Sequence, residues 1–227
     1  MNNLEKIQES IKIKFSDINL LKQVFVHRSY LNEHKDFELD HNERLEFLGD
    51  AVLELVVTEY LYKNFKEPEG MLTTWRSALV KGESLSEIAE KLHIDDYLLL
   101  SHGESKSTGK GRKLILANAF EALIGAIYLD KGYKEVSKFI NNFLIIKLDK
   151  IITNGLYIDA KSKLQEIAQD KYTITPHYDV ISESGPDHAK EFVIGVYLEN
   201  KKIGEGKGSS KQIAEQDAAK VALDSFN

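Results

Sequence analysis

The sequence predicts an all-α N-terminal domain followed by a small α+β domain with the element order α-β-β-β-α. Apolar residues recur at helical spacing from residue 4 to about residue 150, whereas alternating apolar and polar residues follow from residue 178. A turn signal, Thr153-Asn154-Gly155, separates the two patterns. We therefore expect the helical domain over residues 1–152, a linker over 153–158 and the α+β domain over 159–227.

Composition excludes several classes of protein. The chain has 227 residues, 42% of them hydrophobic and only three of them prolines, which allows a sizeable core and argues against a disordered chain. It has no cysteine, which excludes disulfides, thiolate nucleophiles and cysteine-based zinc sites. Residues 1–20 contain no apolar run long enough for a signal peptide or a membrane span, so we expect a cytoplasmic protein without a membrane partner.

The net charge gives a mixed indication. A formal charge of −6 argues weakly against nucleic acid as a partner, because phosphate backbones are bound by Lys and Arg. A metal-dependent enzyme that acts on phosphates would nevertheless carry extra carboxylates, and local basic patches can bind where the total is acidic.

The expected helix over residues 41–62 carries three acids on one face. Glu43, Glu46 and Asp50 stand at i, i+3 and i+7, within about one sixth of a turn. The opposite, core-facing stripe is expected to contain Leu45, Leu48, Gly49, Val52, Leu55 and Val56. Like charges at this spacing destabilise a helix, so either cations from elsewhere in the fold or metal ions should lie among them.

Further helices follow this acidic one. A break at Pro68 and Gly70 precedes a helix from about residue 72, a short helix spans residues 84–92, and a Gly-, Ser- and Lys-rich loop spans 101–113. The next helix, over residues 114–126, is small and apolar apart from Asn118 and Glu121. These two stand at i, i+3 on one face, and burying them is costly unless they are paired or bind an ion.

The C-terminal pattern begins with a helix over residues 159–169, with Asp159 as its expected N-cap. Strands are expected around Tyr178 and over residues 192–198, and a turn at residues 200–202 leads into a third strand at Ile203. The last helix is expected over residues 209–225, with Ser209 and Gln212 fitting a capping box.

Motifs along nearly the whole chain resemble bacterial ribonuclease III. In the helical part these are residues 27–30 (HRSY), 42–50 (NERLEFLGD), the 72–80 helix with Arg76, Gly103-Glu104, and 121–126 (EALIGA). The C-terminal part, with residues 164–166 (LQE), 185–188 (GPDH) and 214–219 (AEQDAA), resembles the double-stranded-RNA-binding domain of that family.

This resemblance implies a homodimeric endonuclease that cuts double-stranded RNA with Mg²⁺, for which Mn²⁺ can substitute. Cleavage would leave 5′-phosphates and 3′ overhangs and would serve rRNA, mRNA and small-RNA processing. By position in the motifs, Asp50 and Glu121 would be catalytic, and the metal ligands would be Glu46, Asp50, Asn118 and Glu121. Glu43 would lie near substrate, and Phe47 would pack across the dimer interface.

One position departs from the family pattern, which normally has Asp where this chain has Asn118. An amide oxygen still ligates a hard cation, so we expect activity with weaker metal affinity. The alternative is a double-stranded-RNA-binding protein with a weakened or inactive nuclease site. A helical dimerisation scaffold that does not bind RNA is a third possibility.

The expected RNA contacts lie in the C-terminal domain, because A-form RNA is recognised through its minor groove and its phosphates. They are Gln165, Glu166, Pro186, His188, Ser209, Ser210 and Lys211. Most family members have a second basic residue after Lys211, where this chain has Gln212. Residues 159–227 contain nine Lys against twelve acids, so we expect modest, salt-sensitive affinity.

Simpler structural roles compete with some of these assignments. Three acids on one helix more often mark a solvated face, and the second helix with Glu121 is what favours a metal site. Phe47 and Trp75 are most simply core residues. His27 and His41 are expected to be structural or solvent-facing.

Overall fold

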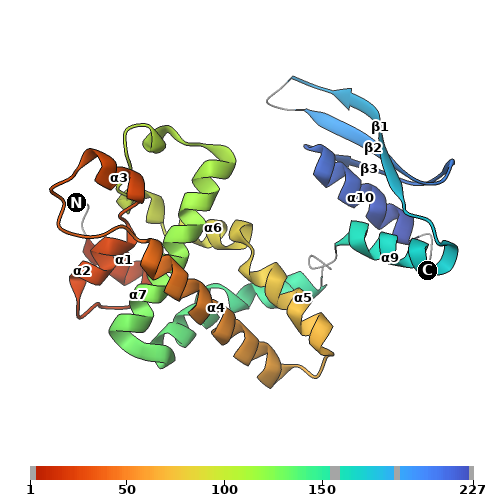
Figure 1. The fold of residues 1–227 in the computed structure, drawn as a ribbon. Helices are drawn as coiled ribbons and strands as arrows, with labels where there is room; N and C mark the ends of the chain where they lie inside the picture. Colours follow the sequence, from red (N-terminus) through yellow and green to blue (C-terminus); the bar gives the residue numbers. More distant parts are fainter. Residues whose placement is uncertain (1–3, 154–158, 187–189, 225–227) are drawn as a thin grey trace. The chain divides into compact units, whose positions relative to one another are not determined.

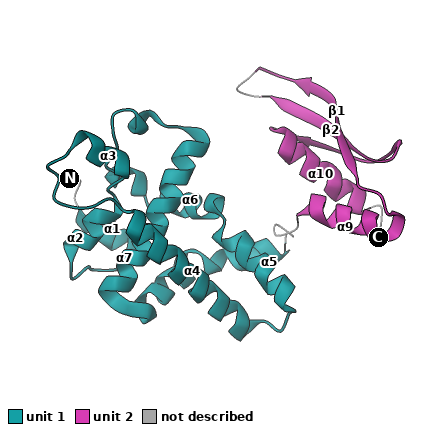
Figure 2. Cartoon of the chain, in the orientation of Figure 1, with its two compact units in different colours: residues 1–157 teal, residues 158–227 magenta. Residues whose placement is uncertain are grey.

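A computed structural model describes residues 4–153, 159–186 and 190–224, which belong to two compact units (Figures 1 and 2). The first unit comprises residues 1–157 and the second residues 158–227. The expected linker lies outside the described residues except for Thr153, which ends a helix. The boundaries drawn from the sequence at residues 152 and 159 therefore stay predictions.

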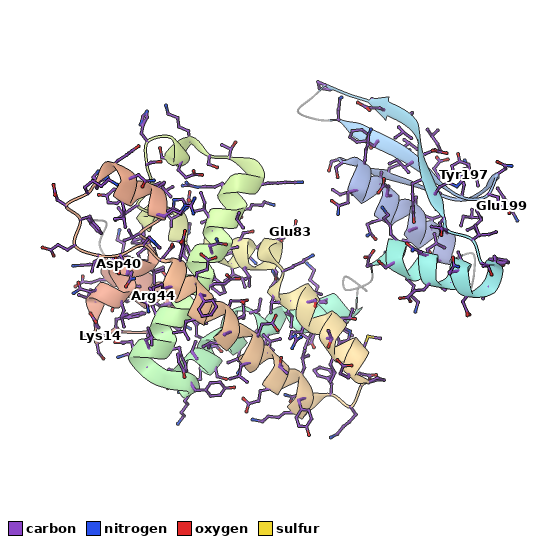
Figure 3. The ribbon with its side chains drawn as sticks, in the orientation of Figure 1. Lys14, Asp40, Arg44, Glu83, Tyr197 and Glu199 are labelled. Carbon is purple, nitrogen blue, oxygen red and sulfur yellow. The ribbon has the colours of Figure 1, made fainter. Side chains whose placement is uncertain are left out.

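Unit 1 is all-α within its described part, as expected. Its helices are α1 (Leu4–Ile11), α2 (Ile18–Val24), α3 (Arg28–Glu33), α4 (Glu43–Asn64), α5 (Glu69–Val80), α6 (Gly82–Lys91), α7 (Gly109–Phe143) and α8 (Leu148–Thr153). Short 3-10 turns, η1 (Ile94–Tyr97), η2 (Glu104–Lys106) and η3 (Ile145–Lys147), connect some of them. Figure 3 places Asp40 just before α4 and Arg44 on its first turn.

The core of unit 1 is built around α4 and α7, which share the most extensive contact of all described elements. Leu53 and Val57 of α4 and Phe120, Leu123 and Ile124 of α7 are fully buried there. Helix α6 also packs on α7, and α5 packs on α4. Trp75 of α5 is buried, as its simplest interpretation predicts.

Several expectations for unit 1 were wrong. Gly70 was expected in a break before a helix from about residue 72, but α5 begins at Glu69 and includes it. Helix α7 begins at Gly109, so the loop is shorter than residues 101–113, and it continues to Phe143 across a kink at Gly132, whose φ is 76°. Leu55, expected on the buried stripe of α4, is 57% exposed. The packing of α7 covers a narrower part of α4 than the hydrophobic pattern suggests, which leaves an apolar surface uncovered.

Unit 2 has the expected order α-β-β-β-α. It consists of α9 (Ala160–Tyr172), β1 (His177–Ser184), β2 (Glu191–Leu198), β3 (Lys201–Gly208) and α10 (Lys211–Asp224). The strands form an antiparallel sheet in the order β1-β2-β3, with a bulge in β1 between Val180 and Ser182. Helix α10 packs on β2, β3 and α9, and its buried alanines (Ala214, Ala218, Ala219 and Ala222) allow this close packing.

The ends of the elements in unit 2 differ in detail from expectation. Asp159 caps α9 as predicted, since its side chain accepts from the Ser162 amide. The β2–β3 turn falls on Glu199 and Asn200, and Figure 3 shows Tyr197 and Glu199 at this end of β2. The residue that caps α10 is Ser210, whose hydroxyl accepts from the Ile213 amide at 3.3 Å, and Ser209 does not fill this role.

No helix in the described ranges combines the length and the apolar character needed to cross a membrane.

Candidate active site

Helices α4 and α7 touch backbone to backbone through two glycines. A Cβ on Gly49 would lie 1.8 Å from the Glu121 carbonyl oxygen, and one on Gly125 would lie 2.2 Å from the Leu45 carbonyl oxygen. No side chain fits at either point without moving a helix. This approach fixes the acids beside Gly49 on α4 next to Glu121 on α7.

The four proposed ligands, Glu46, Asp50, Asn118 and Glu121, come together at this contact. The Asn118 side chain hydrogen-bonds Glu46, and the charges of Glu46 and Asp50 both act on Glu121. Within the described part of the chain, no Lys, Arg or His forms an ion pair with Glu46, Asp50 or Glu121. The three acids therefore lack the protein cation that could have neutralised them.

Burial and nearby negative charges raise the pKa of two carboxyls in this cluster. Burial raises the pKa of Glu121 to about 7, and the negative charges of Asp50 and Glu46 add to the effect. Burial together with Glu43 and Asp50 also raises the pKa of Glu46, while the Asn118 hydrogen bond opposes the rise. A cation placed among these oxygens would relieve the repulsion and displace the protons.

The raised pKa of Glu121 predicts how the metal-free stability depends on pH. A carboxyl whose pKa rises from 4.5 to about 7 on folding binds protons more tightly when folded, so stability falls as pH rises between these values, by up to ~3 kcal/mol. We expect Glu121→Gln to remove this fall. Urea unfolding in a chelator should show Glu121→Gln gaining stability relative to wild type at pH 7.5 but not at pH 4.5. An equal difference in unfolding free energy between Glu121→Gln and wild type at both pH values would contradict this prediction.

The cluster fits a hard divalent cation. Its donors are carboxylate and amide oxygens, the ligands that Mg²⁺ prefers, and Mg²⁺ commonly keeps waters and binds through one or two carboxylates and a substrate phosphate. Among the described residues, no three His, Cys, Asp or Glu side chains converge tightly enough to enclose an ion by themselves. The described side chains therefore do not form a closed cage, and an ion here would need further ligands from water or substrate.

Glu43 lies at the edge of this cluster. Arg28 Nη1 is 3.5 Å from Glu43 Oε1, and His41 Nδ1 is 3.8 Å from Glu43 Oε2. Of the three acids on this face of α4, Glu43 is the one with a cation from elsewhere in the described part of the fold beside it, the Arg28 guanidinium. Glu43 is thus set apart from Glu46 and Asp50.

Phe47, on the same helix, is not a core residue, because 81% of its surface is exposed. Two further apolar residues of α4, Leu55 and Tyr62, are 57% and 76% exposed. With Phe47 they lie at near-helical repeats along one side of α4. We call Phe47, Leu55 and Tyr62 the apolar face of α4.

The predicted RNA contacts of unit 2 are largely accessible. Gln165 and Glu166 are exposed on α9, Pro186 follows β1, and Ser209 and Lys211 are exposed at the start of α10. Ser210 is half-buried because its hydroxyl caps α10. His188 lies outside the described residues.

Comparison with known families matches both units. Residues 17–148 match the model of the ribonuclease-III-like family, and residues 160–225 match the double-stranded RNA binding motif. The chain belongs to the ribonuclease III family. It is accordingly an endoribonuclease of double-stranded RNA, from a family that uses divalent metal, and its C-terminal unit is a double-stranded-RNA-binding domain.

Known ribonucleases III resemble it over their full length. Ribonuclease 3 of Enterococcus faecalis is 46% identical over 225 residues, covering 97% of this chain and 96% of its own. Ribonuclease 3 of Oceanobacillus iheyensis is 46% identical over 229 residues, covering 99% of both chains. A solved nuclease domain of ribonuclease III from Campylobacter jejuni is 41% identical, covers 64% of this chain and 95% of its own, and has a TM-score of 0.56.

Sequence patterns did not show how this ribonuclease III brings its acids together. Gly49 was expected only on a buried stripe, and Gly125 appeared only inside a motif. Two glycines spaced among acids on two apolar helices are the available signal, because small residues allow helices to approach closely. Sequence spacing alone does not say which two helices meet.

Proposed function

We propose that Glu46, Asp50, Asn118 and Glu121 hold Mg²⁺, which Mn²⁺ can replace, and that Asp50 and Glu121 are catalytic in the hydrolysis of duplex RNA. The products would carry 5′-phosphates and 3′ overhangs. The observation that supports this most is the glycine contact of α4 with α7, which gathers four oxygen donors, and no cation from the described residues pairs with the three acids among them. We place the enzyme in the cytoplasm, where bacterial rRNA, mRNA and small RNAs are processed.

When bound, the ion would supply an activated water and charge stabilisation at the scissile phosphate. The protein residues orient the site around it. The Asn118 amide donates to Glu46 and holds that carboxylate toward α7. Burial raises the pKa of Glu121 to about 7, so near neutral pH a positive charge at the site would favour loss of its proton. Glu43, paired with Arg28, would lie toward the substrate.

Asn118→Asp tests both the metal site and the alternative of an inactive nuclease. The substitution restores the usual family residue and adds one negative charge, so the Mg²⁺ concentration for half-maximal cleavage should fall severalfold. Cleavage of a long duplex RNA is measured across a Mg²⁺ titration. Asn142→Asp, the same change at an exposed position of α7, is the matched control and should leave the titration unchanged.

An unchanged or raised Mg²⁺ requirement in Asn118→Asp would contradict the ligand role of Asn118. Absence of wild-type cleavage at every Mg²⁺ or Mn²⁺ concentration, with duplex binding retained, would instead favour the RNA-binding protein without nuclease activity.

We also propose a homodimer formed through the apolar face of α4. An exposed apolar stripe of this kind commonly marks an interface. A groove of about 650 Å³ lies beside its C-terminal end, lined partly by Leu61, Phe65 and Leu72. A two-fold axis near Leu55 would bring Phe47 of one subunit to this groove of its partner, because Phe47 and Tyr62 lie at similar distances from Leu55. The Campylobacter jejuni relative is described with a region involved in dimer formation, which supports this assembly.

For unit 2 we propose RNA contacts from Gln165, Glu166, Pro186, His188, Ser209, Ser210 and Lys211. Lys211 is the simplest to test, because it is exposed on the first turn of α10 with its Nζ 5.9 Å from the Phe192 ring centroid. Cations near a helix N-terminus complement phosphates that approach the free amides.

Lys211→Gln should weaken duplex binding and reduce the magnitude of the salt slope, log Kobs against log[salt], by about 1. Filter binding without divalent metal measures both quantities. Lys220→Gln, at an exposed position later on α10, is the control and should change neither. Equal slopes for wild type and Lys211→Gln would remove Lys211 from the phosphate contacts.

A further inference from the structure

A chain of hydrogen bonds begins at the cap of α3. His27 precedes this helix, and its Nδ1 accepts from the Ser29 amide at 3.3 Å. Nδ1 is also 2.8 Å from Ser29 Oγ. Ser29 Oγ in turn accepts from the Ser101 amide at 3.1 Å. The set is consistent when the Ser29 hydroxyl donates to Nδ1, so His27 must be unprotonated at that atom.

Helix α3 also binds the residue that follows Ser101. Glu33, the last residue of α3, accepts from the His102 amide through both carboxylate oxygens, at 3.3 and 3.0 Å. Ser101 Oγ accepts from the Glu104 amide at 3.1 Å. Ser101 and His102 are thus hydrogen-bonded to the two ends of α3, and they begin the segment of residues 101–107 that precedes α7.

Helix α3 contacts the acidic helix as well. Arg28, its first residue, pairs with Glu43 on the first turn of α4. Backbone hydrogen bonds join the same segments. The Asn42 amide, just before α4, donates to the Val26 carbonyl at 2.9 Å, and the His27 amide donates to the Leu99 carbonyl at 3.1 Å. His27 therefore stands where the starts of α3 and α4 and the segment before α7 meet.

We propose that His27 and Ser29 are positioning residues for RNA cleavage, which keep residues 101–107 and the start of α4 in one fixed arrangement at the edge of the acidic cluster. This inference rests on the proposed site. It assigns a role to two residues that touch none of the four ligands. A displacement of about an ångström at a reacting centre lowers rate far more than it lowers binding.

The neutral state of His27 is part of this arrangement. Burial lowers the pKa of His27, and Arg28 and His41 act in the same direction, while Glu104 and Glu43 oppose them. Protonation at Nδ1 would remove the acceptor for both the Ser29 amide and its hydroxyl, and with it the fixed position of the Ser101 contact. Asn supplies a side-chain oxygen that caps a helix and does not titrate.

The experiment compares His27→Ala and His27→Asn with wild type in steady-state cleavage of duplex RNA at saturating Mg²⁺. His27→Ala should lower kcat by about 10- to 100-fold, as removal of a supporting contact does in metal enzymes, with KM within threefold, because the separate RNA-binding unit supplies much of the affinity. His27→Asn should recover most of kcat. Asp17→Ala, which removes the N-cap of α2 away from this segment, is the control for general loss of stability and should keep kcat.

The pH profile gives a readout that a purely structural cap would not move. The ratio of the His27→Asn rate to the wild-type rate should stay level near pH 6.5, the ordinary histidine pKa, and rise only at lower pH, because burial lowers the pKa of His27 and both proteins share the same acidic cluster. A flat ratio, or a kcat of His27→Ala equal to that of Asp17→Ala, would overturn the inference.

A second pair covers the case in which His27→Ala does not fold. Ser29→Ala should reproduce the loss of kcat and Ser29→Thr, which keeps a hydroxyl, should restore it; equal rates for the two would also overturn the inference. Failure of the proposed metal site is distinguishable, because it would appear as retained cleavage in Glu121→Gln, whatever the His27 variants do.

Discussion

Glu121→Gln is expected to reduce the cleavage rate of duplex RNA by on the order of a thousandfold while leaving duplex affinity unchanged. A bound divalent ion contributes several kcal/mol of charge stabilisation, and each 1.36 kcal/mol is a tenfold change in rate. Glu121 has the most strongly raised pKa of the carboxyls in the cluster. Gln keeps the volume of this side chain but removes the charge that would hold the ion. Single-turnover cleavage at saturating Mg²⁺ measures the loss.

Binding is measured on the same variant without divalent metal, because the RNA-binding unit is separate from the nuclease unit. Glu135→Gln on the same helix is the matched control. Glu135 pairs with Lys138 at 2.7 Å on the half-exposed surface, and such pairs contribute little. A Glu121→Gln enzyme that cleaves within tenfold of wild type would remove Glu121 from the catalytic residues.

Phe47→Asp is expected to dissociate the proposed dimer. Phe47 is 81% exposed in the single chain, so the substitution leaves the fold intact. In a two-fold dimer the change occurs twice, and losing an aromatic anchor that fills a groove of the partner costs about 2 kcal/mol or more each time. The dimer dissociation constant should therefore rise by on the order of a thousandfold. Sedimentation at micromolar concentration measures the change.

Cleavage products give an independent measure of the same variant. If each subunit cuts one strand, the dimer should release double-strand breaks with 3′ overhangs, whereas the Phe47→Asp monomer should at most nick one strand. Ile146→Asp, at a 69% exposed apolar residue of η3, is the control for adding a charge to the surface and should stay dimeric. A Phe47→Asp protein that sediments as wild type does would place the interface elsewhere.

Much of the fold followed from local patterns. The sequence predicted that Glu46 and Asp50 share one face of α4 and that Asn118 and Glu121 share one face of α7, because helix geometry fixes which residues share a face. The order of elements in unit 2 followed from alternation and turn signals, and Asp159 was correctly expected to cap α9. Ends of elements were less accurate, as Ser210 and the start of α7 show, because competing caps and turns differ little in free energy.

The sequence by itself determined the family, the two kinds of domain and which side chains are chemically able to bind a metal. Only the tertiary structure decided that Gly49 and Gly125 bring α4 against α7, that Phe47 and Leu55 face outward, and that His27 joins three segments. The physical reason is the sequence separation over which each interaction acts, since helix periodicity and capping involve residues only a few positions apart. Which helices meet depends on packing between segments about seventy residues apart, and burial and charge at that contact then set the pKa of Glu121.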